Sequence, residues 1–156
     1  MRYYIEVENN IERVRVIEED GAIVAVQFAR ETAVEEALEY KTTPVLQEAK
    51  RQLEEYFAGK RTVFDLPLNP TGTVFQKQVW AQLQQIPYGE TRSYSQIATA
   101  IGNPKASRAV GGANNKNPIG IIVPCHRVIG ANGALVGYAG GLDLKEKLLQ
   151  LERDNI

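Results

Sequence analysis

The residues of this 156-residue chain best suited to chemistry are Cys125 and His126, its only cysteine and its only histidine. They follow an apolar run at residues 119–123 and then Pro124. A cysteine reacts as its thiolate, and a nearby imidazole can remove the thiol proton or, once cationic, stabilise the thiolate. Structurally, Cys125 could instead be a small buried apolar residue, and His126 a cap or a core residue. The pair favours a reactive thiol and leaves the structural alternative open.

The adjacency of the two residues limits how they can cooperate. Neighbours on a strand point to opposite faces, so Cys125 and His126 meet only if the chain turns at Pro124 or if a water molecule bridges them. A protease-like pair, whose base and nucleophile come from separate elements, is therefore disfavoured. A thiol hydrolase would also need repeated turnover, and the chain has no second histidine to serve it.

The net charge is −1, but the charged residues are distributed unevenly along the chain. Residues 1–69 carry 9 Lys and Arg against 14 Asp and Glu, whereas residues 70–156 carry 9 against 5. From residue 91 to residue 142 there is no acidic residue. The basic residues of this stretch are Arg92, Lys105, Arg108, Lys116 and Arg127. An acid-free stretch attracts polyanions such as nucleic acid, although five charges are few for a DNA footprint and a solvated surface remains the alternative.

Composition excludes several classes of protein. The hydrophobic content of 44% is ordinary for a globular chain, and no apolar run approaches membrane-spanning length. One cysteine cannot form an internal disulfide, and the N-terminus does not resemble a signal peptide, so we expect a cytoplasmic protein, associated with the nucleoid if prokaryotic. Residues 1–69 contain neither Cys nor His. One cysteine and one histidine cannot supply the four ligands that a structural zinc site usually takes, so we predict no zinc. We also expect no other metal and no cofactor.

The first part of the chain predicts an antiparallel sheet. Apolar and polar residues alternate over residues 3–7, 13–17 and 22–28, and turn dipeptides separate these runs at residues 9–10 and 20–21. The next segment, residues 32–57, reads as mostly helical, with Pro44 starting a second helix. We expect an α+β fold whose first part is a three-stranded antiparallel sheet plus helices.

A boundary falls at residues 69–72, where Asn, Pro, Thr and Gly cluster and the sign of the charge changes. It divides the chain into two predicted domains, residues 1–69 and 70–156. The second reads as mostly helical. Capping boxes at residues 73–76 and 93–96 start two of its helices, and Asn103-Pro104 is expected to cap a third.

The second and third of these helices, joined by a tight turn at Gly102, form a helix-turn-helix candidate. The third helix carries Lys105 and Arg108 together with three small residues, Ala106, Ser107 and Ala109, which would let it approach DNA closely. A packed helical hairpin without a DNA role is the alternative. A glycine-rich loop at residues 130–141 follows, and a last amphipathic helix spans residues 143–151, ended by Glu152.

Pro124-Cys125-His126-Arg127-Val128 resembles the active-site motif of the O6-alkylguanine-DNA alkyltransferases, also called methylated-DNA–protein-cysteine methyltransferases. The resemblance covers essentially all of residues 70–156, whereas residues 1–69 resemble the family only in pattern and length. The matching segments, in chain order, are residues 75–76, 79–80, 86–91, 93–94, 102–106, 108–113, 117–118, 137–138, 140–141 and 145–152.

The resemblance implies a suicidal DNA-repair protein. It implies a ribonuclease H-like first domain and a winged-helix-like second domain that flips the damaged base out of duplex DNA through the minor groove. The alkyl group of O6-alkylguanine, or of O4-alkylthymine, would then move irreversibly to Cys125, once per molecule. The expected protein is a monomer that binds double-stranded DNA and needs no protein partner, membrane or cofactor.

The resemblance also assigns the catalytic roles. Glu152 would orient His126, and His126 would deprotonate Cys125 through a water molecule. Asn117 would brace the turn beneath the site through backbone hydrogen bonds. Tyr94 would help rotate the phosphate and donate to guanine N3, which stabilises the charge that develops on the leaving base.

For DNA and base binding, the resemblance points to Arg108 as the finger that fills the space left by the flipped base. The Cys125 and Val128 carbonyls would accept from the guanine amino group, the Ala139 N–H would donate to O6, and Tyr138 would wall the pocket. The remaining residues assigned to DNA are Ser95, Asn103 and Lys105.

Two other classes stay as alternatives. Alkyltransferase-like proteins bind damaged bases without transferring the alkyl group, but they lack the cysteine that this chain has at position 125. The other is a helix-turn-helix regulator with a sensory N-terminal domain. Larger members of the family couple methyl transfer to transcription, but we expect no extra domain here.

Overall fold

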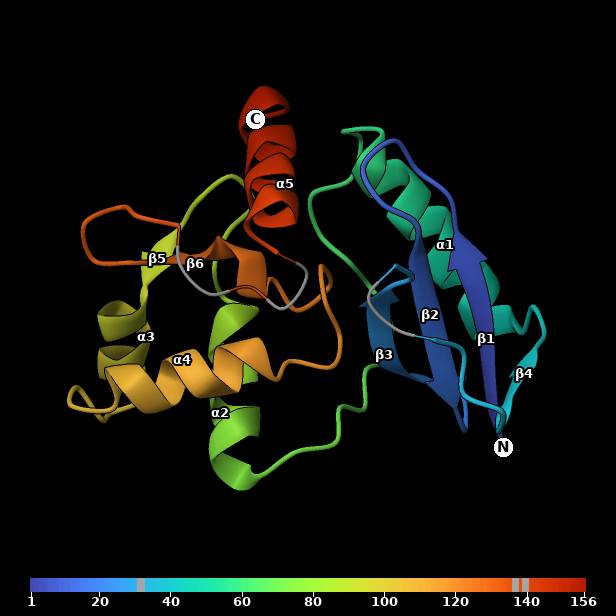
Figure 1. Ribbon diagram of the computed structural model, residues 1–156, viewed down its shortest axis with the longest axis horizontal. Coiled ribbons are helices and arrows are strands. Elements are labelled where there is room, and N and C mark those ends of the chain that lie inside the picture. The colour runs from blue at the N-terminus through green and yellow to red at the C-terminus, as the bar shows by residue number, and fades with distance from the viewer. Residues whose placement is uncertain (31–32, 136–137, 139–140) are drawn as a thin grey trace.

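The computed structural model describes residues 1–156 apart from 31–32, 136–137 and 139–140. Figure 1 shows a sheet with one long helix at one side of the molecule and a group of helices at the other. The sheet confirms the three predicted strands, β1 (Arg2–Val7), β2 (Val14–Glu19) and β3 (Ala22–Phe28), which pair antiparallel. Alternating apolar residues put one face of each strand into the core.

A fourth strand, β4 (Leu38–Tyr40), pairs parallel with β1 and completes the order β3-β2-β1-β4. The helix expected over residues 32–43 is therefore wrong for the part that the structure describes, residues 33–43. Residues 33–42 are exposed apart from half-buried Leu38, so a helix there would bury almost no apolar surface. The open edge of β1 offers backbone hydrogen bonds instead, and β4 takes them.

Helix α1 (Pro44–Phe57) begins at Pro44 as predicted. The Thr43 side chain caps it by accepting from the Leu46 N–H, and Pro44 suits the first turn because it has no N–H to satisfy. Leu46, Ala49 and Leu53 are fully buried and belong to the same apolar core as the inner face of the sheet. The helix thus covers one face of the sheet.

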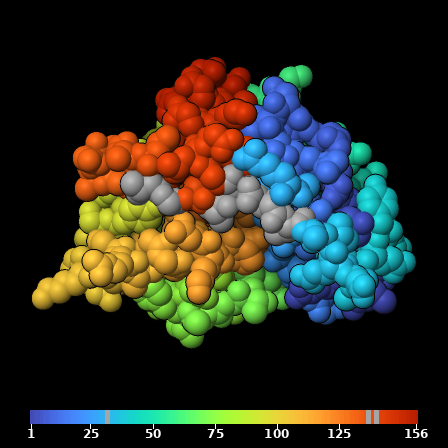
Figure 2. Space-filling view, viewed as in Figure 1, coloured from blue at the N-terminus to red at the C-terminus, as the bar shows by residue number. Residues whose placement is uncertain are grey.

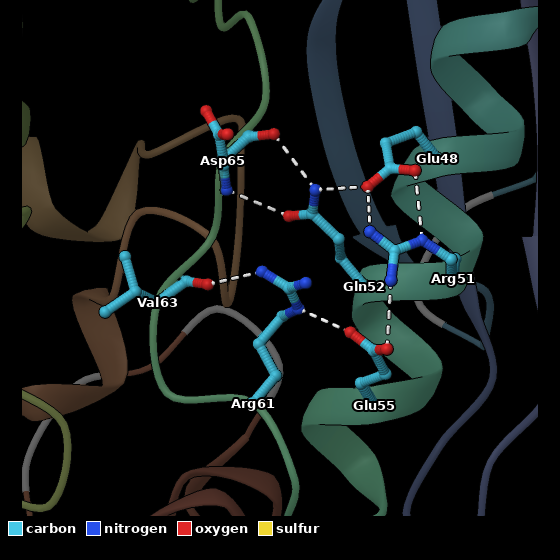
Figure 3. Close-up of polar contacts among 7 residues, drawn as sticks. All are labelled: Glu48, Arg51, Gln52, Glu55, Arg61, Val63 and Asp65. Atoms are coloured by element: carbon cyan, nitrogen blue, oxygen red, sulfur yellow. Dashed lines mark hydrogen bonds and ion pairs between the residues drawn. The ribbon is translucent and has the colours of Figure 1, made fainter.

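The segment after α1 is fastened to that helix by the polar network of Figure 3. The Gln52 side chain exchanges two 2.9 Å hydrogen bonds with the backbone of Asp65, and it also donates to Glu48. Arg61 donates to Glu55 at 2.7 Å and to the Val63 carbonyl at 2.8 Å. Residues 61–65 therefore follow α1 closely before the chain enters its helical part.

The C-terminal part contains α2 (Val74–Leu83), α3 (Tyr94–Ala100), α4 (Ser107–Asn115) and α5 (Leu142–Asp154). Both predicted capping boxes are confirmed, with reciprocal hydrogen bonds between Thr73 and Gln76 and between Ser93 and Gln96. A short parallel pair, β5 (Arg92–Ser93) and β6 (Val128–Ile129), links the start of α3 to the segment after Cys125.

Two predicted helix ends are wrong. Helix α4 begins at Ser107, not at Pro104, because the Ala106 N–H donates to the Asn103 carbonyl and closes a separate turn that contains Pro104. The predicted turn at Gly102 is confirmed, with φ +82°. Helix α5 continues two residues past Glu152 to Asp154, so Glu152 lies within the helix.

Backbone hydrogen bonds join the two parts of the chain. The outer edge of β3 pairs with residues on both sides of the predicted boundary, Ile23 with Leu68 and Val26 with Ile119. One apolar core runs through the N-terminal sheet, α1 and the C-terminal helices. The division into domains of residues 1–69 and 70–156 stays a prediction. Among the helices of the described residues, none is both long and apolar enough to span a bilayer.

Candidate active site

The chain turns at the predicted nucleophile. Cys125–Arg127 form a 3-10 turn, η1, directly after Pro124, and all three of its residues are buried. This is one of the two arrangements that would let Cys125 and His126 cooperate, since a 3-10 turn does not send neighbours to opposite faces. The Cys125 side chain is 6% exposed, so it sits just under the surface.

The imidazole of His126 is held by Glu152 of α5. His126 Nε2 lies 2.6 Å from Glu152 Oε2, and both residues are fully buried. Because a carboxylate only accepts, the hydrogen belongs on Nε2, and Nδ1 of the neutral ring keeps its lone pair. Nδ1 is buried and has no hydrogen-bond partner among the described residues. The free lone pair makes Nδ1 the atom able to take a proton.

Donors surround the Glu152 carboxylate. Arg127 donates to both oxygens, at 2.8 and 3.1 Å, and the Gly89 N–H and the Tyr56 hydroxyl add one hydrogen bond each. Burial alone would raise the pKa of Glu152, but the hydrogen bonds and charges of His126 and Arg127 outweigh it and hold the pKa well below its ordinary value. The carboxylate is therefore ionised and fixed in place.

Burial sets the resting protonation state of the pair. It raises the pKa of the Cys125 thiol, against opposing effects from Asn117 and Lys145. It lowers the pKa of His126, where Glu152 acts in the opposite direction. The thiol is therefore protonated and the imidazole neutral near pH 7, so thiolate forms only when Cys125 loses its proton to a base.

A buried lysine accompanies the thiol. Lys145 of α5 is fully buried, and burial lowers its pKa from 10.5 to about 8, while the nearby Cys125 opposes this shift. Near pH 7 the ammonium remains mostly charged. Its charge favours the thiolate over the thiol.

Asn117 braces a strained turn that leads into the site. Ile121 has φ +68°, a left-handed conformation unfavourable for a β-branched residue, and the Ile122 N–H donates to the Gly120 carbonyl at 2.7 Å. The Asn117 side chain donates to the Ile119 and Val123 carbonyls and accepts from the Ile119 N–H. These bonds are the kind of brace that the resemblance implies for Asn117.

The predicted DNA-contacting residues lie on and around α3 and α4. Arg108 is exposed near the start of α4, Ser95 is exposed in the first turn of α3, and Asn103 and Lys105 are exposed around the turn between the two helices. Figures 1 and 2 show the loop between α3 and α4 projecting from the left edge of the molecule. Helix α4 rests on α2, where the Trp80 indole donates to the Ala113 carbonyl at 2.8 Å.

Tyr94 connects this helical pair to the thiol. It begins α3 and is half-buried, and a Cβ on Gly111 of α4 would lie 3.8 Å from its ring. Burial and the nearby Cys125 raise the pKa of Tyr94, so its hydroxyl stays protonated. The first residue of α3 therefore lies near enough to Cys125 for the two groups to interact electrostatically.

Two family descriptions match the chain: "6-O-methylguanine DNA methyltransferase, ribonuclease-like domain" over residues 3–70 and "6-O-methylguanine DNA methyltransferase, DNA binding domain" over residues 74–154. The constitutive methylated-DNA–protein-cysteine methyltransferase of Bacillus subtilis is 50% identical over 98% of this chain and 96% of its own length. That of Methanosarcina acetivorans is 71% identical over 67% of each chain. The chain belongs to the 6-O-methylguanine DNA methyltransferase family.

Solved structures agree with this membership. The crystal structure of the O6-methylguanine methyltransferase of Mycobacterium tuberculosis superimposes with a TM-score of 0.92 at 43% identity, covering 100% of this chain and 95% of that one. Mycobacterium tuberculosis OGT in complex with DNA gives 0.91 at 44% identity, covering 98% and 94%. The α+β fold expected from the sequence is that of this methyltransferase family.

The remaining predicted pocket residues are only partly described. Val128 is fully buried in β6. Tyr138 packs edge-on against Phe28 of the N-terminal sheet, with ring centroids 6.1 Å apart. Its buried hydroxyl lies near Cys125 without a hydrogen-bond partner of good geometry among the described residues. The predicted contact of the Ala139 N–H lies outside the described residues.

Four residues that the sequence analysis did not place in the site lie within it. Arg127 donates to Glu152. From the sequence it was counted only as a basic residue, although its position inside the methyltransferase motif could have indicated a role in the site. The Asn114 amide donates to the Cys125 carbonyl at 3.3 Å, and its other end is unpaired among the described residues. Lys145 lies in a segment matched to the family but was given no role. Tyr56 left no local signal, because its partner is 96 residues away.

No cluster of three or more His, Cys, Asp or Glu that could hold a metal ion occurs in the described part of the chain. The expected absence of zinc stays a prediction, which metal analysis of the purified protein would decide.

Proposed function

We propose that this chain repairs DNA by moving the alkyl group of O6-alkylguanine in a duplex to Cys125, once per molecule. The observation that carries the proposal is the buried thiol beside a neutral imidazole, whose Nε2 is held by Glu152 while Nδ1 has no partner among the described residues. Relatives named methylated-DNA–protein-cysteine methyltransferases support the same reaction class.

The transfer is a displacement at the alkyl carbon. The Cys125 sulfur forms a bond to that carbon as the bond from carbon to O6 breaks, and the electron pair leaves with guanine. The thiol proton passes to His126 Nδ1, through the water molecule that the resemblance implies, and Glu152 stabilises the resulting imidazolium. Guanine regains one proton, so charge balances. The product is a thioether, which explains a single turnover.

The base must leave the stack before the sulfur can reach its alkyl group. In the proposal, Arg108 fills the space left in the duplex from the exposed face of α4, with Ser95, Asn103 and Lys105 holding the backbone. Tyr94 has a protonated hydroxyl near Cys125, so it is suited to donate to guanine N3 as charge develops. Val128, Tyr138 and Ala139 would line the base pocket, and O4-alkylthymine would be a second substrate. We further propose a cytoplasmic monomer that acts without a protein partner.

The test is intact-mass spectrometry after mixing the protein with excess duplex that carries one O6-methylguanine. We expect a mass gain of one methyl group, mapped to Cys125, that stops at one per molecule. Cys125→Ser should remove the gain while keeping lesion binding. An unshifted mass of the unaltered chain with lesion-selective binding would instead indicate a damage-binding protein, and absence of binding would contradict the proposal altogether.

A further inference from the structure

The catalytic carboxylate accepts a hydrogen bond from the N-terminal part of the chain. Tyr56 lies one residue before the end of α1, and its hydroxyl donates to Glu152 Oε2 at 2.6 Å. The same oxygen lies 2.6 Å from Nε2 of His126. All three side chains are fully buried. One oxygen atom therefore connects α1 to the turn that carries the nucleophile.

We propose that Tyr56 is a positioning residue for alkyl transfer, whose hydroxyl fixes the Glu152 carboxylate and thereby His126. The inference rests on the proposed function, because it adds an N-terminal member to the relay proposed there. It also gives the N-terminal part of the chain a role in the reaction besides structural support.

The ring of Tyr56 is held from several sides. Phe57 and Tyr88 meet it edge-on, with centroids 5.4 and 6.2 Å away, and Phe64 lies tilted at 5.5 Å. Phe64 belongs to the segment fastened to α1 through Gln52 in the network of Figure 3. The rings that hold Tyr56 come from segments before and after the predicted domain boundary, and their contacts direct the Tyr56 hydroxyl toward Glu152.

The hydroxyl remains a donor throughout the working pH range. Burial, and then the negative charge of Glu152, raise the pKa of Tyr56 well above its ordinary value. A protonated phenol that donates to Oε2 withdraws charge from the oxygen that also faces the imidazole.

Several titratable and charged groups act on the His126 ring. They are Glu152 and Lys145 from α5 and Arg127 from η1, while Tyr56 from α1 acts through the carboxylate. Tyr88, from the loop after α2, lies near the carboxylate, but its hydroxyl makes no hydrogen bond to it among the described residues. Without the Tyr56 hydroxyl, Oε2 keeps as donors, within the described part of the chain, only His126 and Arg127. Its charge is then less compensated, so the imidazolium is favoured and the pKa of His126 should rise.

The test compares the unaltered chain with Tyr56→Phe, which keeps the ring and removes only the hydroxyl. Because His126 is the only histidine, its imidazole nitrogen resonances need no assignment and can be titrated directly. We expect a higher titration midpoint for His126 and methyl transfer about tenfold slower in single-turnover assays. Affinity for the methylated duplex should be unchanged.

Tyr88→Phe is the matched control. It removes a neighbouring buried hydroxyl that has no hydrogen-bond partner among the described residues, so neither the titration nor the rate should change. In a Glu152→Gln background, Tyr56→Phe should cause no further shift of His126, because the hydroxyl acts through the carboxylate. If Tyr56→Phe fails to fold, 3-fluorotyrosine at position 56, a stronger donor, should lower the midpoint instead.

Two results would overturn the inference. One is an unchanged His126 titration in folded Tyr56→Phe, whatever its rate, since loss of packing alone would then account for any slower transfer. The other is an equal shift in the Glu152→Gln background. Failure of the proposed function appears separately, as an unaltered chain that gains no methyl group, and the titration still tests Tyr56 in that case.

Discussion

The carboxylate of Glu152 accounts for most of the polar contacts at the site. It accepts from Tyr56, Gly89, His126 and Arg127, which come from three separate segments of the chain. A buried charge is tolerated only when donors satisfy it, and removing one donor exposes the rest of the group to an unfavourable environment. The neutral imidazole with a free Nδ1 follows from this arrangement, and so does its readiness to accept the thiol proton.

At the same scale, Asn117→Ala should destabilise the protein and slow transfer. Asn117 makes three hydrogen bonds around a turn in which Ile121 is strained, so we expect a loss of about 2–3 kcal/mol in unfolding free energy. Asn117 also lowers the pKa of Cys125, so its removal should make the thiolate harder to form. Urea denaturation and single-turnover transfer measure the two effects. Asn115→Ala, at an exposed position, is the control, and equal unfolding midpoints for the two variants would contradict the prediction.

At the scale of elements, α3 and α4 separate the thiol from the exposed surface proposed to meet DNA. The capping box of α3 and the turn at Gly102 are local features. The placement of the two helices depends on α2, whose Trp80 holds α4, and on the β5–β6 pair, which joins the start of α3 to the segment after Cys125. Two residues of the helical pair approach the nucleophile: Tyr94 of α3, whose pKa burial and then Cys125 raise, and Asn114 of α4, which donates to the Cys125 carbonyl. The residues proposed to bind DNA and Tyr94, proposed to assist transfer, therefore belong to one short helical unit.

Arg108→Ala should slow the repair of duplex DNA without slowing the intrinsic reaction of the Cys125 thiol. Arg108 is exposed on α4, so its loss should not unfold the protein, but the space left by the flipped base would no longer be filled. We expect transfer from methylated duplex to fall about tenfold or more, while reaction with the free base O6-benzylguanine stays unchanged. Arg108→Lys separates charge from stacking, because a lysine cannot stack as a guanidinium does. Equal slowing with duplex and free base would contradict this role for Arg108.

At the scale of the whole molecule, the N-terminal sheet and the C-terminal helices share one core and one set of backbone hydrogen bonds. Val26 of β3 donates to the Pro118 carbonyl at 2.9 Å and accepts from the Gly120 N–H at 3.1 Å, next to the strained turn. Arg30 and Asp143 add an ion pair of 3.2 Å between the two parts. A change of protonation at the site should therefore change the free energy of unfolding of the whole protein.

The pH dependence of stability tests this coupling. The pKa values of His126 and Glu152 are both lower in the folded chain, so the unfolded chain binds protons first as the pH falls. Stability should decrease below about pH 6.5 through His126 and again below about pH 4.5 through Glu152, with a slope of at most about 1.4 kcal/mol per pH unit for each group. Denaturant unfolding at pH 8, 7, 6 and 5 measures the first window, which His126→Gln should flatten. Stability that rises on acidification from pH 7 to pH 5 would show a raised pKa and contradict the prediction.

Local features of the sequence determined much of the secondary structure. The strands, the Pro44 helix start and both capping boxes were predicted correctly, because alternation and capping depend on residues within a few positions of one another. The strand β4 and the start of α4 were missed. The first depends on the open edge of β1, and the second on a backbone turn at residues 103–106 that competes with the cap.

The motif around Cys125 was sufficient to indicate a reactive thiol and, by resemblance, the family that the comparisons then showed. Only the tertiary structure decided which groups complete the site. Glu152 reads in sequence as an ordinary helix-ending residue, yet it is fully buried, and Tyr56 reaches it from 96 residues away. Hydrogen bonds between distant segments leave no periodic trace in a sequence, because they depend on how the sheet, α1 and α5 pack around a common core.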